Sequence, residues 1–378
     1  MQKRMNVNNE ESRMATQALL TPVKVGPYEL RNRVVMAPMT RDRADNPELA
    51  PTDLHVKYYA QRASAGLIIT EGSQISPQGV GYIFTPGIYS EAQVAGWKKV
   101  TDAVHAKDGR IFIQLWHVGY VSHPDFHDGE LPVAPAALNP NTRVFTPNGL
   151  RDTVVARALK TEEITAIVQD YVQAAKNAMR AGFDGVEIHG ANGYLIEQFL
   201  RDSTNQRTDE YGGSVENRAR FLFDVVGEVS DAIGSDKVGV RLSPANVGNV
   251  PADSDTRSLY DFVIGALSSF DLAYLHLRDA AGDVSGIPNM VSDVVKHFRG
   301  VYQGTLIANT GYDRERGNQA IRDGRADMVA YGIPYIANPD LVERFRHAAQ
   351  LAQADRDTFY TGGEKGYIDY PFMQAAAA

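Results

Sequence analysis

The sequence predicts a single α/β domain with the architecture of a (β/α)8 barrel. Short runs rich in β-branched residues alternate with helical stretches, and this alternation is typical of a parallel sheet joined by crossover helices. Eight such runs occur, which is the number of strands that closes a barrel of this kind. The chain has 378 residues, of which 43% are apolar, so it is long enough to bury a large core.

The predicted strands follow one another with room for one helix between neighbours, with one exception. In chain order they are residues 33–39, 66–72, 110–116, 185–191, 238–244, 272–278, 305–311 and 328–332. The third and fourth strands begin about 75 residues apart, and the stretch between them is rich in Pro, His, Asn and Gly. We therefore expect an insertion at about 120–160 that covers the barrel mouth, within a barrel domain that spans 19–372.

The helix that follows this insertion has the clearest pattern. Thr161 is expected to cap its N-terminus, where Glu162 and Glu163 suit the positive end of the helix dipole. Gly182 is expected to end it. Its apolar residues recur at helical spacing and form one face: Ile164, Ile167, Val168, Tyr171, Val172, Ala175, Ala178 and Met179.

The composition excludes several classes of function. The sequence contains no Cys, which excludes disulfides, Cys-ligated zinc, iron–sulfur clusters and thiolate nucleophiles, so any redox chemistry needs a bound cofactor. The net charge of −8 is spread along the chain, which disfavours nucleic acid as a partner. No apolar stretch approaches the ~18 residues of a membrane span. We expect a cytoplasmic protein with a disordered leader at 1–18 and a loose tail at 373–378.

The C-terminal ends of the predicted strands carry polar and aromatic side chains, and a barrel enzyme builds its active site there. These side chains belong to Thr40, Gln114, Trp116, His189, Asn192, Tyr194 and Arg241, and Gly72 ends the second strand. Several also fit an ordinary structural role, such as a turn hydroxyl for Thr40 or a backbone partner for Gln114. Arg241 is harder to explain in that way, because a buried guanidinium needs an anionic partner.

The residues after the fourth strand leave more than one interpretation open. His189 and Asn192 fit a hydrogen-bonded core pair, and Tyr194 fits a packing aromatic. No carboxylate or further His stands beside them at the spacing of a metal site, so no metal is expected. The motifs of Rossmann, P-loop, α/β-hydrolase and zincin sites do not occur.

The segment from 189 to 221, HGANGYLIEQFLRDSTNQRTDEYGGSVENRARF, closely resembles the Old Yellow Enzyme family of FMN-dependent ene-reductases. The resemblance extends from about residue 20 to residue 372. It includes APMTR at 37–41, GLIITEG at 66–72, IQLWHVG at 113–119, RLSP at 241–244, ANPDLVERF at 337–345 and GYIDYP at 366–371. A chance match across so many ordered segments is excluded in practice.

The resemblance implies a non-covalent FMN across the barrel mouth. The residues expected to bind its ring are Pro38, Met39, Thr40, Gly72, Gln114 and Arg241. Backbone groups of Thr310, Gly311 and Gly332 are expected to hold the phosphate, as in other phosphate-binding barrels. Many relatives carry an Arg directly after the glycine that follows strand eight. This chain has Ile333 there, so we expect weaker FMN retention than in those relatives.

The resemblance also implies a reaction. His189 and Asn192 would hydrogen-bond the carbonyl oxygen of an α,β-unsaturated substrate, and Tyr194 would protonate its α-carbon. NADH or NADPH would reduce the flavin in the same pocket, in a ping-pong cycle. Tyr82, Trp116 and Tyr367 match aromatic pocket positions of the family.

A second departure from the family pattern and two alternative functions complete the prediction. The loops 245–250 and 280–285 are small or polar where relatives often have an aromatic residue, so the cleft is expected to be open to bulkier acceptors.

A barrel lyase or aldolase acting on a phosphorylated substrate is one alternative function, although no predicted strand ends in Lys. A non-catalytic flavin-binding protein is the other, and a homo-oligomer is possible in each case.

Overall fold

The computed structural model describes residues 17–374, and within them the predicted barrel is present. Eight parallel strands close on themselves in the order β10-β11-β12-β13-β14-β3-β4-β5. Their bounds are β3 Val34–Met36, β4 Leu67–Gln74, β5 Ile111–Trp116, β10 Gly185–Gly190, β11 Val238–Leu242, β12 Tyr274–Arg278, β13 Leu306–Asn309 and β14 Met328–Tyr331. Each overlaps one predicted strand, so the fold class is confirmed. Residues 1–16 and 375–378, which hold most of the predicted leader and part of the tail, lie outside the described residues.

Strands β3 and β11 end earlier than the sequence suggested, because proline cannot donate to a sheet ladder. Pro38 follows β3 after one residue, and Pro244 follows β11 after one residue. Strand β4 instead continues two residues beyond the prediction, with a register shift between Ile69 and Gly72. The irregularity lies where β4 meets the cavity described below.

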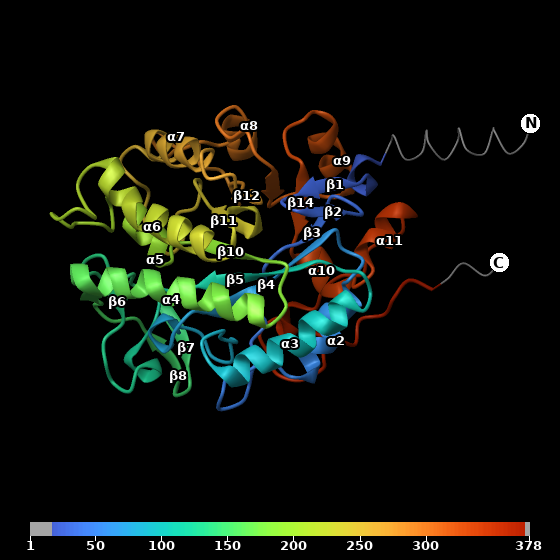
Figure 1. Ribbon diagram of the computed structural model, residues 1–378, viewed down its shortest axis with the longest axis horizontal. Helices are drawn as coiled ribbons and strands as arrows, with labels where there is room; N and C mark the ends of the chain where they lie inside the picture. The colour runs from blue at the N-terminus through green and yellow to red at the C-terminus, as the bar shows by residue number, and fades with distance from the viewer. Residues whose placement is uncertain (1–16, 375–378) are drawn as a thin grey trace, which may run out of the picture.

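Helices surround the strands, as Figure 1 shows for α3, α4, α6 and α7. Their bounds are α2 Asp53–Gln61, α3 Glu91–His105, α4 Thr161–Arg180, α5 Leu195–Leu200, α6 Val215–Ile233, α7 Thr256–Leu267, α8 Val294–Arg299, α9 Arg314–Arg322, α10 Ile333–Ala337 and α11 Leu341–Arg346. None of the helices between residues 17 and 374 has both the length and the apolar character that crossing a membrane requires.

The predicted cap of α4 is wrong by one residue. Lys160 is the N-cap, and its backbone N–H donates to the Glu163 carboxylate at 2.7 Å. The Thr161 hydroxyl donates instead to Asp209 at 2.9 Å, a tertiary contact that local sequence does not reveal. Gly182 lies just beyond the helix with φ of +86°, as a C-terminal glycine is expected to do.

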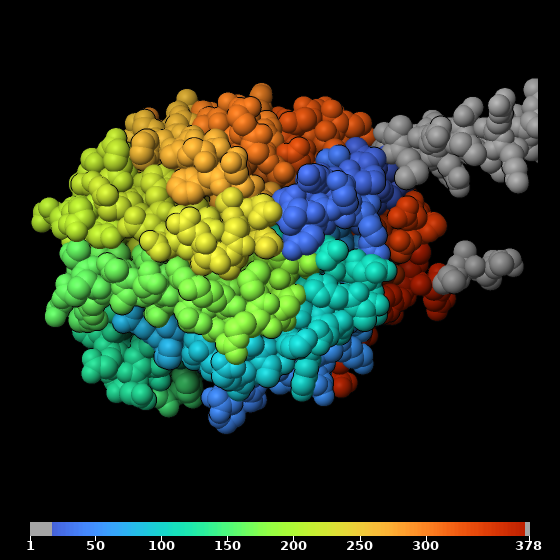
Figure 2. All heavy atoms as spheres, in the orientation of Figure 1, coloured from blue at the N-terminus to red at the C-terminus, as the bar shows by residue number. Residues whose placement is uncertain are grey.

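A short hairpin that the sequence did not predict packs against the N-terminal ends of the barrel strands. It consists of β1 Val23–Val25 and β2 Tyr28–Leu30. Val25 and Leu30 belong to one hydrophobic cluster with Phe112 and Tyr274, which lie at the starts of β5 and β12. In Figure 2 this blue segment is bordered by yellow, cyan and orange surface, so it lies against parts of the chain that are far apart in sequence.

The stretch at 120–160 forms two small strand pairs before α4. Strands β6 Val133–Ala134 and β9 Arg157–Ala158 are parallel, and β7 Arg143–Thr146 and β8 Gly149–Asp152 form a hairpin. Val144 and Ala156 share a hydrophobic cluster with Trp116 at the C-terminal end of β5. That this stretch covers the barrel mouth stays a prediction.

Candidate active site

Two cavities that share residues lie at the C-terminal ends of the barrel strands. The larger has a volume of about 490 Å³ and the smaller about 70 Å³. Predicted site residues that line the larger one are Pro38, Met39, Thr40, Arg241, Thr310, Gly311, Gly332 and Ile333. Those that line the smaller one are Pro38, Thr40, Gly72, Gln114, Trp116, His189, Asn192, Tyr194 and Arg241. The structure therefore brings together residues from almost the whole length of the chain.

Strand register explains why these residues lie side by side in pairs. His189 on β10 is opposite Arg241 on β11, and Gln114 on β5 is opposite Gly72 on β4. Below them Glu187, two residues before His189, accepts a hydrogen bond from Nε2 of Gln114 at 2.7 Å, and its carboxylate lies 2.8 Å from Nδ1 of His276. Sequence reasoning missed this buried carboxylate, although its position two residues from His189 on one strand places both on the same face.

Arg241 is the cation that lines both cavities. Its side chain donates to Oδ1 of Asn309 at 3.0 Å, while its buried Nε has no hydrogen-bond partner among the described residues. Burial lowers the pKa of Arg241 to about 10, and nearby Glu187 opposes this shift. The guanidinium is therefore still charged at neutral pH and holds a donor ready for an anionic group.

His189 is held as a neutral donor. Its Nδ1 accepts a hydrogen bond from the Ala191 backbone N–H at 3.3 Å, which leaves the proton on Nε2. Burial, with Arg241 next in effect, lowers the pKa of His189 well below its usual value. The ring is roughly parallel to Trp116 at a centroid distance of 6.1 Å and meets Tyr194 edge-on at 5.1 Å.

Tyr194 is the N-cap residue of α5, and its hydroxyl lies 3.0 Å from the hydroxyl of Tyr82. Burial raises the pKa of Tyr194 well above 10, and the Tyr82 hydroxyl adds to the shift. The phenol is therefore protonated at any physiological pH. Tyr82 also stacks on Trp116 at 5.2 Å, which completes an aromatic wall beside the small cavity.

Of the three aromatic residues predicted to line the pocket, Trp116 does so, Tyr82 stacks on Trp116 without lining either cavity, and Tyr367 lies elsewhere. Tyr367 is fully buried, stacks on Tyr58 at 4.0 Å, and lies under the guanidinium of Arg43 at 4.8 Å. It lines neither cavity. The same C-terminal segment contributes Phe359 and Tyr360 to the larger cavity instead, so the prediction of Tyr367 as a pocket residue is corrected.

The far end of the larger cavity lies between the ends of β13 and β14. Thr310 and Gly311 have φ of +84° and +77°, a left-handed pair that turns the chain sharply after β13. Ile333 is 52% exposed at this end. Arg316 is a cation close to this turn. Its Nη1 would lie 3.7 Å from a methyl group placed on the Cα of Gly311.

The residues present fit FMN. The larger cavity is of the size of a cofactor site, it has an unpaired donor on Arg241, and a glycine-bearing turn closes its other end. Within residues 17–374, no group of three or more His, Asp or Glu side chains is placed to hold a metal ion.

A closed (β/α)8 barrel with this cavity at its C-terminal strand ends defines a barrel enzyme with a cofactor-sized site. Residues 18–352 match the NADH:flavin oxidoreductase / NADH oxidase family, and the chain belongs to that family. The chain is thus a flavin oxidoreductase of the Old Yellow Enzyme type, which confirms the resemblance seen in the motifs. Membership of this family argues against the lyase and the non-catalytic alternatives.

The similarity to named relatives extends over nearly the whole chain. The chain is 44% identical over 360 residues to 12-oxophytodienoate reductase 1 of Oryza sativa subsp. japonica, covering 94% of this chain and 93% of that protein. It is 45% identical over 361 residues to a protein of Leishmania infantum named as a probable flavin mononucleotide-dependent alkene reductase, with 94% and 97% covered.

Two solved structures are similar to this chain over the same extent. Morphinone reductase in complex with tetrahydroNAD is 47% identical, with a TM-score of 0.88 and coverage of 94% of this chain and 98% of that one. The old yellow enzyme homologue of Zymomonas mobilis is 43% identical, with a TM-score of 0.90 and coverage of 94% and 100%.

Proposed function

We propose that the protein reduces the C=C bond of α,β-unsaturated carbonyl compounds. The observation that carries this proposal is the composition of the small cavity. There a neutral His189 with its proton on Nε2, the Asn192 amide and the protonated Tyr194 hydroxyl line one space of about 70 Å³. Two neutral donors beside one weak acid suit a substrate that gains negative charge on oxygen and then a proton on carbon.

The first role is activation of the acceptor. Nε2–H of His189 and Nδ2–H of Asn192 would donate to the substrate carbonyl oxygen and draw electron density toward it. Each donor of this kind stabilises the transition state by about 2.7–4 kcal/mol where negative charge develops. Because His189 is neutral, it stabilises this charge by hydrogen bonding and keeps its own proton.

The second role is proton delivery. Bound FMN, once reduced by NADH or NADPH, supplies the hydride that the β-carbon accepts. Tyr194 gives its hydroxyl proton to the α-carbon, and the phenolate regains a proton from solvent. The net reaction consumes one alkene, one NAD(P)H and one proton, and it yields the saturated compound and NAD(P)+. Tyr82, 3.0 Å away, holds the Tyr194 hydroxyl in place.

The remaining predicted residues would hold the cofactor. Thr40 and Gln114 have the donors and acceptors that the polar edge of a flavin needs, and Arg241 would stabilise the negative charge that reduction places on the ring. The turn at Thr310 and Gly311, together with Gly332, would hold the phosphate. That the cleft is open on the side of loops 245–250 and 280–285 stays a prediction.

The visible spectrum of the purified protein under anaerobic conditions tests the proposed function. Flavin absorbance is expected to bleach with NADPH or NADH and to recover when 2-cyclohexenone is added, with the saturated ketone as product. Recovery with oxygen but not with the enone would overturn the proposal and leave a flavin oxidoreductase with another acceptor.

The rate of enone reduction is expected to be nearly independent of pH between about pH 7 and 9. The pKa of His189 is shifted down and the pKa of Tyr194 is shifted up, so neither group changes protonation in this window. The measurement is the single-turnover rate of flavin reoxidation by 2-cyclohexenone at saturating concentration. A fall of tenfold across this range would show that one of the two groups titrates there.

The variant Ile333→Arg is expected to bind FMN more tightly, by about tenfold in Kd. An exposed Arg at this position gains a charged hydrogen bond to the phosphate, worth roughly 1.5 kcal/mol. Flavin fluorescence during titration of the deflavinated protein measures the Kd, and Ile333→Gln serves as the uncharged control. A gain below twofold would contradict the prediction, and would be the result if Arg316 already neutralises the phosphate.

A further inference from the structure

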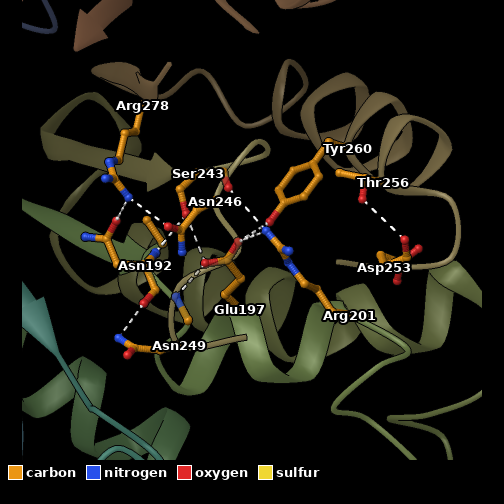
Figure 3. A network of polar contacts seen from close by, with 12 residues as sticks. Asn192, Glu197, Arg201, Ser243, Asn246, Asn249, Asp253, Thr256, Tyr260 and Arg278 are labelled. Carbon is orange, nitrogen blue, oxygen red and sulfur yellow. Dashed lines mark hydrogen bonds and ion pairs between the residues drawn. The ribbon is translucent and has the colours of Figure 1, made fainter. Parts of the chain in front are cut away.

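A network of polar contacts lies directly behind Asn192 (Figure 3). The Asn192 backbone has φ of +62°, an uncommon conformation for a residue other than glycine. Its N–H donates to the Ser243 hydroxyl at 2.8 Å, and its carbonyl accepts from Asn249 at 3.0 Å. The next N–H, of Gly193, donates to the Glu197 carboxylate at 2.6 Å. The backbone is thus fixed from three neighbouring segments.

The side chain of Asn192 is held from another direction, by Arg278 at the end of β12. The Arg278 guanidinium donates to Oδ1 of Asn192 at 3.1 Å and to Oδ1 of Asn246 at 2.9 Å. In Figure 3 Arg278 reaches toward both amides. A guanidinium only donates hydrogen bonds, so the Asn192 amide must present its oxygen to Arg278. Its NH2 group is then the part of the amide left for the small cavity that Asn192 lines.

Arg278 also contributes charge. Both of its acceptors are neutral amides, and none of the ion pairs of the described residues includes it. A cation bonded to the amide oxygen polarises the amide and makes its N–H groups stronger donors. The polarised Asn192 amide stabilises the substrate most when the oxygen that accepts from Nδ2 becomes negative. The substrate carbonyl oxygen gains this negative charge during hydride addition.

We propose that Arg278 is a positioning residue that orients and polarises the Asn192 amide for the substrate carbonyl. This inference rests on the proposed function and adds to it. Arg278 acts through Asn192, so substrate affinity and the rate of C=C reduction depend on it while the cofactor site does not. No sequence motif indicates the role, because Arg278 and Asn192 lie 86 residues apart.

The test compares Arg278→Leu with Asn192→Ala and with the double variant. The reduced holoenzyme is mixed with increasing 2-cyclohexenone under anaerobic conditions, and the reoxidation rate gives a limiting rate constant and an apparent Kd. We expect Arg278→Leu to lower their ratio about tenfold, and Arg278→Lys to recover part of the loss. The double variant should be no slower than Asn192→Ala alone, because both substitutions remove the same interaction.

Two controls separate positioning from a general loss of structure. FMN Kd, measured by fluorescence, and thermal stability of Arg278→Leu should stay near the wild-type values. Arg257→Leu, which removes an exposed arginine from α7, should leave the enone rate unchanged. An Arg278→Leu rate within twofold of wild type, or a loss that adds fully to that of Asn192→Ala, would overturn the inference. Failure of the wild-type enzyme itself to react with the enone would instead overturn the proposed function, and the inference with it.

Discussion

The variant Tyr194→Phe is expected to reduce 2-cyclohexenone about 10²–10³ times more slowly than the wild-type enzyme. The substitution keeps the ring and its contact with Trp116 but removes the only proton that Tyr194 can deliver to the α-carbon. A well-placed general acid contributes about 10²–10⁴ in rate, and we expect the lower part of this range because solvent can supply the proton slowly. The measurement is the single-turnover rate of flavin reoxidation at saturating enone.

Two comparisons isolate the proton from other effects. A quinone takes up its protons on oxygen, so it should reoxidise the Tyr194→Phe enzyme at close to the wild-type rate. The variant Tyr82→Phe removes the hydroxyl that lies 3.0 Å from Tyr194 but leaves the acid in place, and its enone rate should fall by less than about tenfold. An enone rate in Tyr194→Phe close to wild type would show that another donor protonates the substrate.

The barrel was predictable from the sequence because its strands are buried on both faces. Every residue of β5, β10 and β11 is buried, and these strands consist of apolar residues and glycine except at Gln114, Glu187, His189 and Arg241. The side chains at their C-terminal ends must then converge at one mouth. This is why the sequence alone predicts that residues as distant as Gly72 and Arg241 lie in one site.

Contacts made by irregular segments were not predictable in the same way. Tyr360 and Tyr367 lie seven residues apart in a C-terminal stretch with little regular structure, and no periodicity indicates which of them faces the cavity. The bond between Arg278 and Asn192 joins strand ends that are not neighbours in the barrel. Such contacts depend on how the chain turns after each strand, which a pattern of residue types does not determine.

The variant Arg201→Met is expected to lower the free energy of unfolding by about 3–5 kcal/mol. Arg201 and Glu197 have fully buried side chains and form an ion pair at 2.6 Å, and Tyr260 donates to the same carboxylate at 2.7 Å. Removing Arg201 leaves a charged carboxylate without its counter-ion inside the protein, which is among the most costly single substitutions. Urea unfolding of the holoenzyme, followed by far-UV circular dichroism, measures the change.

The double variant Arg201→Met with Glu197→Leu distinguishes this explanation from simple loss of packing. If the cost comes from the unpaired charge, removing the carboxylate as well should restore part of the stability, because no buried ion is then left without a partner. Glu197 also accepts from Gly193 and Ser243, so the double variant should regain stability while remaining slower with the enone. A double variant less stable than Arg201→Met alone would contradict this account and would show that Glu197 stabilises the fold mainly through its contacts with Gly193, Ser243 and Tyr260.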